Sequence, residues 1–197
     1  MKGKTPEDEH CIYLDRVPPS NEEVFWISFE SDPKLKKSKG NIYGRCLPCI
    51  QNLYNQLRIG KQDIALGTAY QCWKITVVVR SCEECIALLS EFERRHPHLY
   101  VYGKIGNGKE GAKTRVVVFH AESIPERDRV LAALKECLPE LRNINIIDLQ
   151  ISRACSVLYD DLFGDWRDWR PIMKIKYPEN VDKILDRIRK VLFWAKR

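Results

Sequence analysis

Apolar and polar positions in the middle of the chain repeat first at the period of a strand and then at that of a helix. Residues 72–80, CWKITVVVR, form a β-branched run that is typical of a strand. Ser81 and Glu84 follow at the spacing of a capping box, which predicts that a helix begins directly after Ser81. The apolar stripe of this helix is Cys85, Leu88, Leu89 and Phe92. The helix is expected to end before Pro97, so the first unit is a strand followed by a helix.

Two further segments, residues 98–105 and 113–120, alternate in polarity, and each predicts a strand. Between them lies GNGKEG at residues 106–111, whose glycines supply the positive-φ positions that a hairpin turn needs. We therefore expect these two strands to pair as an antiparallel hairpin.

A second helix and a last strand follow the hairpin. Ser123 and Glu126 form another capping box, and Pro139 predicts the end of the helix. The apolar stripe of this helix is Val130, Leu131, Leu134 and Leu138. Residues 144–151, INIIDLQI, are again typical of a strand. The predicted order is β-α-β-β-α-β, the ferredoxin-like arrangement, in which a four-stranded antiparallel sheet carries both helices on one face.

The rest of the chain predicts α/β extensions on either side of this core. We expect an N-terminal extension at residues 1–70, a ferredoxin-like core at 71–155, and a C-terminal extension at 156–197 that packs on the core. The expected parts of the extensions are a strand at 24–29, a lysine-rich loop at 33–40, a helix at 46–59, a tryptophan-bearing loop at 163–171, a strand at 173–177 and an amphipathic helix from 178 onward. The predicted fold class is α+β.

The charge of the chain narrows the expected partners. Its 33 Lys and Arg residues exceed its 27 Asp and Glu residues, and the formal net charge of +6 favours acidic partners such as nucleic acid. No apolar run approaches the ~18 residues of a membrane span, and residues 1–10 lack the apolar core of a secretion signal. We therefore expect a cytoplasmic protein with no membrane association. In that compartment its eight cysteines are expected to be buried thiols, metal ligands or redox groups.

The predicted hairpin gathers cations and aromatic rings that suit nucleic acid. Pairing the strands about Lys109 places Tyr102 opposite Val116 and Tyr100 opposite Val118. The candidate nucleic-acid-binding residues on this sheet face and at the hairpin tip are Lys74, Arg80, Tyr100, Tyr102, Lys104, Lys109, Lys113 and Arg115. Rings stack bases and cations contact phosphates, so this surface predicts binding of RNA or of a single strand. The valines on the same face fit equally well under a terminal extension or against a second subunit of a homodimer.

The stretch GNGKEGAKT, residues 106–114, resembles the phosphate-binding loop G-x-x-x-x-G-K-[ST] but departs from it twice. Ala112 separates Gly111 from Lys113, and the loop leads into a strand, whereas the motif needs a helix N-terminus to hold the phosphates. A solvated hairpin tip is therefore favoured over a nucleotide site.

Two groups of titratable residues are weaker candidates for catalysis. The same pairing places His98 opposite His120, where two imidazoles suit a metal ion or acid–base chemistry. A slip of one residue separates the rings, so ordinary surface histidines are favoured. Asp160 and Asp161 begin an aspartate-rich segment, 159–170, that suits magnesium and phosphodiester chemistry. The alternation of tryptophan and arginine there favours instead a loop that is anchored by tryptophans and locally ion-paired.

Two C-x-x-C pairs are candidates for a four-thiolate zinc site. The cysteines are Cys46, Cys49, Cys82 and Cys85. The 32 residues between the pairs exceed typical zinc spacings, and Cys85 belongs to an apolar stripe, so buried thiols are favoured. The second pair, between a strand and a helix, also suits the thioredoxin layout. The glycine-rich hairpin that follows disagrees with that layout, which needs a helix and a proline there.

The sequence as a whole predicts a nucleic-acid-binding protein. The main alternative is a module of the same topology that senses small molecules or oligomerises, similar in outline to ACT domains. Against it, the Asp/Asn-Arg-Pro-Gly turn common in those domains is replaced by residues 81–84, Ser-Cys-Glu-Glu. A metal-dependent nuclease or a zinc-binding protein is the third hypothesis.

Overall fold

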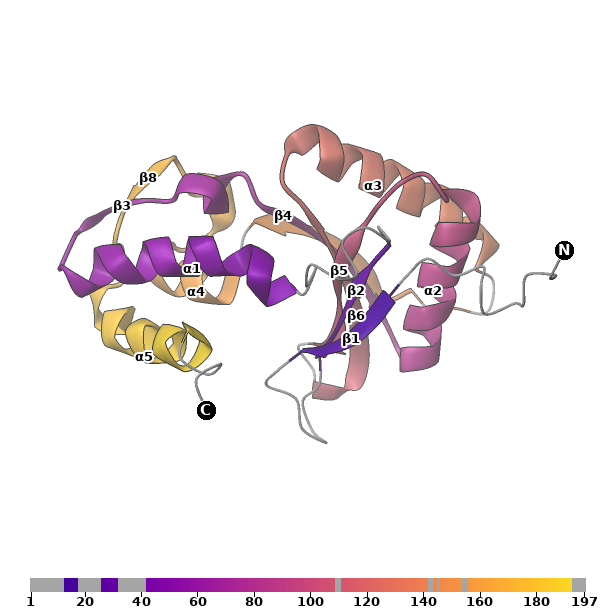
Figure 1. Ribbon diagram of the computed structural model, residues 1–197, viewed down its shortest axis with the longest axis horizontal. Coiled ribbons are helices and arrows are strands. Elements are labelled where there is room, and N and C mark those ends of the chain that lie inside the picture. The colour runs from indigo at the N-terminus through magenta and orange to yellow at the C-terminus, as the bar shows by residue number, and fades with distance from the viewer. Residues whose placement is uncertain are drawn as a thin grey trace, which may run out of the picture. The chain divides into compact units, whose positions relative to one another are not determined.

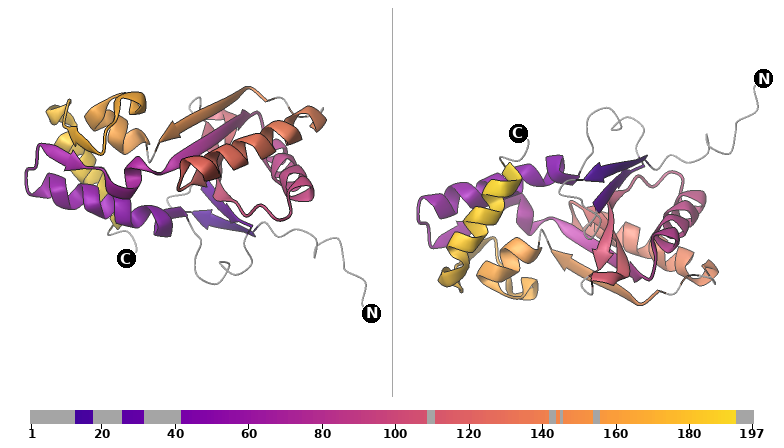
Figure 2. Two further views of the ribbon diagram at one scale, coloured as in Figure 1. Left: turned by 90° about the horizontal axis from the view of Figure 1, so that it is seen from above. Right: turned by 90° about the horizontal axis from the view of Figure 1, so that it is seen from below.

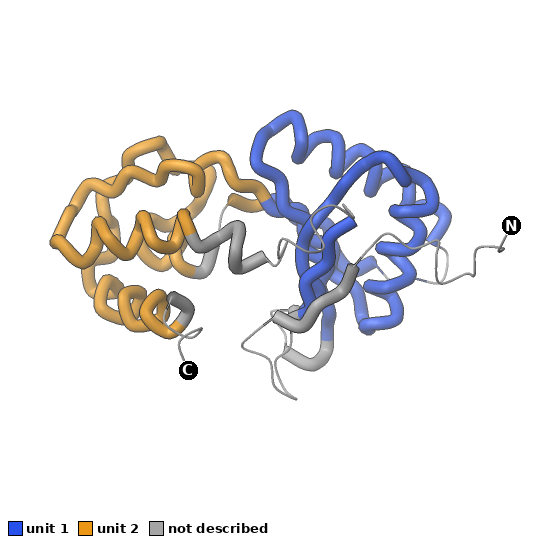
Figure 3. Tube along the Cα trace, viewed as in Figure 1, with its two compact units in different colours: residues 1–43, 74–151 blue, residues 44–73, 152–197 orange. Residues whose placement is uncertain are grey.

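The computed structural model describes residues 13–17, 26–31, 42–108, 111–141, 144, 146–153 and 156–192. Within them the chain is α+β, as predicted (Figure 1). It divides into two compact units (Figure 3): unit 1 comprises residues 1–43 and 74–151, and unit 2 comprises residues 44–73 and 152–197. Unit 2 therefore joins residues 44–70 of the predicted N-terminal extension to the whole predicted C-terminal extension, whereas residues 1–43 belong to unit 1 with the predicted core. The lysine-rich loop predicted at 33–40 lies outside the described residues.

The larger sheet has six strands rather than the four that were predicted. In spatial order they are β1 (Tyr13–Val17), β2 (Trp26–Glu30), β5 (Tyr102–Gly108), β6 (Gly111–Ala121), β4 (Trp73–Val79) and β7 (Asp148–Arg153). The count is higher because β2 pairs antiparallel with β5, and β1 pairs antiparallel with β2. The segment predicted as a strand at 24–29 thus joins the sheet, and β1 was not predicted.

Two helices, α2 (Cys82–Arg95) and α3 (Ile124–Cys137), are associated with this sheet, and both begin as predicted. The Ser81 hydroxyl accepts a hydrogen bond from the Glu84 amide, and the Ser123 hydroxyl accepts one from the Glu126 amide, each at 3.2 Å. A short 3₁₀ turn, η3 (Leu138–Glu140), follows α3. Phe92 of α2 packs on Phe119 of β6, with ring centroids 5.3 Å apart. This contact identifies the sheet face that the helices cover (Figure 2).

The hairpin of β5 and β6 forms as predicted, but the predicted register is wrong. Gly103 pairs with Phe119 and Gly106 pairs with Val116, so β5 begins four residues later than expected. The cause is a turn directly after α2, in which the Leu99 amide donates to the His96 carbonyl at 2.9 Å. Residues 106–108, predicted as part of the turn, lie in β5, and residues 109–110 are outside the described residues.

Gly103 explains why this register is the stable one. A Cβ atom at this position would collide with the Val118 carbonyl oxygen and would lie 2.6 Å from Cζ of Phe29. The Phe29 ring therefore occupies the space that a side chain at 103 would need, and it packs edge-on against Phe119 at 5.3 Å. A glycine is required there because the backbone and an aromatic ring approach closely.

Unit 2 is built around a small apolar core of helices. Its elements are α1 (Ile42–Arg58, which begins in unit 1), β3 (Asp63–Ala65), η2 (Gly67–Tyr70), α4 (Ser156–Phe163), η4 (Trp166–Asp168), β8 (Ile172–Lys174), η5 (Pro178–Asn180) and α5 (Val181–Leu192). Strands β3 and β8 pair antiparallel. The predicted apolar stripe of the last helix buries Ile184, Leu185 and Ile188. Among the described residues, no helix is long and apolar enough to cross a membrane.

Candidate nucleic-acid surface

The residues predicted to bind nucleic acid do not form one open surface. Burial alternates along β4, so Lys74 lies on the face away from the helices and is half-buried. Lys104 is also half-buried, whereas Arg80 is exposed. Tyr100 is 57% exposed and lies just before β5. Arg80 and Tyr100 are therefore the described members of the predicted set that solvent reaches most freely.

Tyr102 is enclosed and is not available to stack a base, which corrects the prediction. Its side chain is 8% exposed. Its ring stacks on that of His120 with centroids 6.1 Å apart and planes 12° apart, and its hydroxyl donates to the Glu122 carboxylate at 3.1 Å. The register places Tyr102 between Glu30 of β2 and His120 of β6, so it belongs to an enclosed polar row across three strands.

The valines on this face are also enclosed. Val116 is 7% exposed and Val118 is 5% exposed within the chain itself. A homodimer through the face stays a prediction, but these two positions are buried without a second subunit.

Arg115 and the two hairpin lysines complete the predicted set. Arg115 follows the alternation of β6 toward the helix-covered face. There its charge helps to lower the pKa of Glu83, after a larger effect from hydrogen bonding with Ser81. Arg115 therefore does not share a face with Lys104. Lys109 lies outside the described residues, as does the side chain of Lys113.

The predicted histidine pair is wrong because of the register. His98 is exposed in the turn that precedes β5, whereas His120 is buried in β6 and stacks on Tyr102. His96 lies at the end of α2, where its Nε2 is 3.5 Å from the Glu136 carboxylate. The three rings therefore do not converge on one site.

The two C-x-x-C pairs belong to different units. Cys49 lies in unit 2, where its sulfur is 3.0 Å from the Thr68 hydroxyl, and the side chain of Cys46 is outside the described residues. Cys82 and Cys85 lie on α2 in unit 1. Burial raises the pKa of the Cys85 thiol to about 12, so this cysteine is protonated at neutral pH. Among the described residues, no three His, Cys, Asp or Glu side chains are grouped to hold a metal ion.

The aspartate-rich segment forms the tryptophan-anchored loop that was favoured. Trp169 is 2% exposed, and its indole N–H donates to the Gly164 carbonyl at 3.0 Å. Asp165 caps η4 and pairs with Arg167 at 2.8 Å. Asp161 lies 3.6 Å from Arg187 of α5. Asp160, the other catalytic candidate, is half-buried in α4. Asp161 and Asp165 therefore face basic partners, and the described part of the chain has no group of three acidic, His or Cys side chains that could hold magnesium.

The net charge of the protein is confined to unit 2. Unit 1 contains 19 Lys and Arg residues and 19 Asp and Glu residues, whereas unit 2 contains 14 and 8. Unit 2 therefore carries all of the +6, and unit 1 is neutral. Among the residues of unit 2 whose side chains the structure describes, the exposed basic ones are Arg58, Lys61, Arg167, Arg170, Lys174, Lys176, Lys183, Arg187, Arg189 and Lys190.

Three exposed cations lie in strand β8 of unit 2 and just outside its ends. Arg170, Lys174 and Lys176 are exposed at alternate positions, with Ile172, which is 64% exposed, between the first two. Met173 and Ile175 are buried, whereas Pro171 is exposed; only Ile172–Lys174 belong to β8, and Arg170 and Lys176 lie just outside its ends. Asp168 lies 3.7 Å from Lys176, so the row is partly balanced.

Sequence reasoning missed a stack of rings and guanidinium groups in unit 2. The Arg153 guanidinium lies between the rings of Tyr70 and Trp73, 4.2 Å from each centroid. Trp73 meets Trp166 edge to face at 5.6 Å, and Arg167 lies over the Trp166 ring at 4.9 Å. Trp166 and Arg167 are adjacent in the sequence, but the other members come from distant segments.

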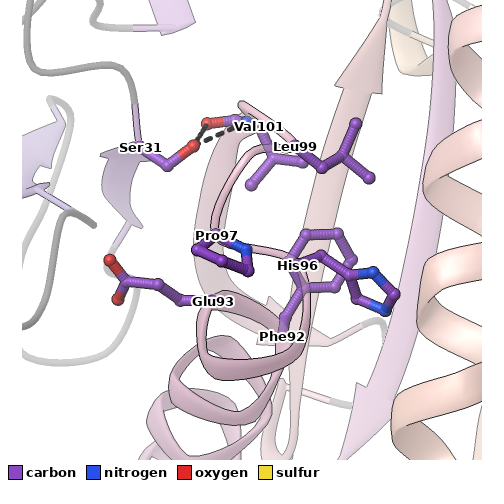
Figure 4. A pocket seen from close by; sticks show the side chains of 7 residues that line it. All are labelled: Ser31, Phe92, Glu93, His96, Pro97, Leu99 and Val101. Carbon is purple, nitrogen blue, oxygen red and sulfur yellow. Dashed lines mark hydrogen bonds between the residues drawn. The ribbon is translucent and has the colours of Figure 1, made fainter.

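A small hollow in unit 1 is lined mostly by side chains from α2 and the segment that follows it (Figure 4), and it is too small for a ligand of the size that a sensing module would bind. Its lining residues are Ser31, Phe92, Glu93, His96, Pro97, Leu99 and Val101. It offers about 10 Å³ to the centre of a water molecule, which is room for a single water. The Ser31 hydroxyl closes one side through hydrogen bonds with the Val101 backbone.

Comparisons with known proteins do not identify the chain. No protein family, no curated protein and no solved structure matches it. The residues and their geometry alone support a functional interpretation.

Proposed function

We propose that the protein binds nucleic acid, and a single strand such as RNA in particular, with unit 2 as the principal contact. The observation that carries the proposal is the separation of charge: unit 2 has a net charge of +6 and unit 1 has none. A basic unit attracts phosphates and gains affinity when the counterions of the nucleic acid are released.

The row on β8 gives this attraction a geometry. Lys174 lies in β8 about 6.8 Å along the strand from the exposed Ile172, and the exposed Arg170 and Lys176 lie two residues before and two residues after this pair in the sequence. Such a row suits a polymer whose charges also repeat along one direction. Asp168, which lies 3.7 Å from Lys176, is itself exposed. An exposed ion pair of this kind contributes only ~0–1 kcal/mol, so Lys176 remains available to a phosphate.

The β5–β6 hairpin is proposed as a second contact. The sequence places Lys109 and Lys113 near the expected tip of this hairpin. The exposed Arg80 follows β4, and the exposed Tyr100 precedes β5. We also infer that β4-α2-β5-β6-α3-β7 is a ferredoxin-like unit whose sheet is extended by β1 and β2. The spatial order β5-β6-β4-β7 supports this inference.

A titration of a fluorescent single-stranded RNA at several salt concentrations tests the proposal. The wild-type protein should bind, and log affinity should fall linearly with log salt. The double substitution Lys174→Gln and Lys176→Gln should make the slope shallower by about 1.4, because each phosphate contact with a single strand contributes about 0.7 to the slope. The same double change at the hairpin tip, Lys109→Gln with Lys113→Gln, measures the second contact.

A matched control removes the same charge from the neutral unit. Arg129 and Lys135 are exposed on α3, and replacing both with glutamine should leave the slope unchanged. Equal effects of the α3 and β8 variants would show that only the total charge matters, and would refute a surface on unit 2. Absence of binding at low salt would refute the proposed function itself.

A further inference from the structure

We propose that Trp166 is the base-stacking platform of unit 2, so that the ligand is recognised by its unpaired bases and not only by its phosphates. This inference rests on the proposed function, and it deepens it by naming the part of the ligand that is read. The indole is half-buried and stands at the first position of η4, four residues before the cationic row begins at Arg170.

The loop holds this indole rigidly. The Asp165 carboxylate accepts the Arg167 amide at 2.9 Å, and the Trp169 amide donates to the Trp166 carbonyl at 3.2 Å. Gly164 takes a positive φ of 76°, and its carbonyl accepts the indole N–H of the buried Trp169. A ring that is fixed before binding loses little conformational entropy when a base stacks on it.

A second layer of side chains supports the indole from behind. Trp166 packs on the apolar core of unit 2 and meets Trp73 edge to face. Trp73 is 4% exposed, and the Arg153 guanidinium lies over its ring and over the Tyr70 ring, 4.2 Å from each centroid. The Arg153 guanidinium also donates to the Tyr70 carbonyl. Trp166 is therefore supported by Trp73 and by the core of unit 2, while its half-buried side chain stays partly accessible to solvent.

Arg167 is the exposed side chain that lies over the Trp166 ring. Its guanidinium lies 4.9 Å from the Trp166 ring centroid, and its side chain is 68% exposed and paired with Asp165. An exposed cation–π contact and an exposed ion pair are each weaker than a base stacked on an aromatic ring. An arriving base can thus take the ring face, and the displaced guanidinium is then free to contact a phosphate.

A duplex cannot use such a platform. Its bases are stacked on one another inside the helix, and side chains reach only their edges. Unpaired bases present their faces, which aromatic side chains stack irrespective of sequence. Trp166 therefore predicts a preference for single strands over duplexes of equal charge, with little dependence on base sequence.

The experiment compares two ligands that share charge but differ in bases, single-stranded oligouridine RNA and inorganic polyphosphate. The variants are Trp166→Leu, which keeps the apolar contact with the core but has no aromatic face, and Trp166→Phe, which keeps a ring. Trp166→Leu should weaken binding of oligouridine about 5- to 150-fold, the range for the loss of one stacked base. Trp166→Phe should retain most of the affinity. Binding of polyphosphate should be the same for all three proteins.

The outcomes separate this inference from the proposed function. If the wild-type protein binds neither ligand, both the proposed function and the stacking role of Trp166 are refuted. If it binds both but Trp166→Leu binds oligouridine as the wild type does, or loses both ligands equally, only the platform is refuted. As a test on the unaltered protein, oligouridine containing 5-iodouridine should crosslink to Trp166 under ultraviolet light, as mapped by mass spectrometry. Crosslinks found only elsewhere would overturn the inference even if Trp166→Leu fails to fold.

Discussion

Replacing Tyr102 with alanine should destabilise the protein strongly, whereas the same change at Tyr100 should not. The two tyrosines are two residues apart, but Tyr102 is 8% exposed and Tyr100 is 57% exposed. Removing a buried aromatic ring leaves a cavity and costs ~3–5 kcal/mol. Removing an exposed ring changes stability by about 0.5 kcal/mol or less.

The contribution of the Tyr102 hydroxyl can be measured separately. Tyr102→Phe keeps the ring on His120 and removes only the hydrogen bond to the Glu122 carboxylate, which is 3.1 Å long. A hydrogen bond to a charged group contributes ~1.5–3 kcal/mol, and Glu122 is exposed, so water replaces part of it. We expect a loss of about 1 kcal/mol for this variant.

Urea unfolding of the three variants, followed by circular dichroism and by tryptophan fluorescence, measures these differences. The m-values should match that of the wild type, so that midpoint shifts report stability alone. Equal stabilities of Tyr100→Ala and Tyr102→Ala would contradict the enclosed polar row. Such a result would make the sheet face available for stacking bases, as the sequence first predicted.

Three further predictions concern packing and titration. Gly103→Ala should prevent cooperative folding, because its Cβ would collide with the backbone of β6; a cooperative urea transition near that of the wild type would refute the register. Burial raises the pKa of Cys85 from 9.0 to about 12, so its stabilising effect is complete below about pH 9 and declines as pH rises toward 12, because the unfolded chain then loses a proton that the folded chain keeps. Cys85→Ala should reduce that alkaline decline, and an unchanged curve of urea midpoint against pH would contradict it. Hydrogen bonds from Arg94 and Arg95 lower the pKa of Glu91 from 4.5 to about 2, so its stabilising effect is present above about pH 4.5 and is lost as pH falls toward 2. Glu91→Gln should flatten the curve over that range, and an equally steep acid limb would show that other groups are responsible.

The helices were predictable because their signals are local. The capping boxes at Ser81 and Ser123 involve residues three positions apart, and both form in the structure. The apolar stripe of α2 buries Cys85, Leu88, Leu89 and Phe92, as its spacing indicated. A signal carried by adjacent turns of one helix does not depend on the rest of the fold.

The register and the surface were not predictable because they depend on distant segments. Gly103 is fixed opposite Phe119 by the ring of Phe29, which comes from a strand more than seventy residues earlier. Tyr102 lies on the sheet face where it was expected, but Glu30 of β2 and His120 of β6 are its neighbours there and the row is enclosed, which no local pattern around Tyr102 indicates. The side chains that support Trp166 also come from segments distant in the sequence. Trp73 packs against Trp166, and Arg153 lies over Trp73, only after the chain has folded.

Binding of single-stranded nucleic acid by unit 2 is tested by measuring how RNA binding by the Lys174→Gln, Lys176→Gln variant depends on salt concentration. The wild type should bind a single-stranded RNA, and the slope of log affinity against log salt should become shallower by about 1.4 in this variant. The Arg129→Gln, Lys135→Gln control should keep the wild-type slope. If the slope of the Lys174→Gln, Lys176→Gln variant equals that of the wild type, or if the wild-type protein does not bind RNA at low salt, unit 2 is not the nucleic-acid surface proposed here.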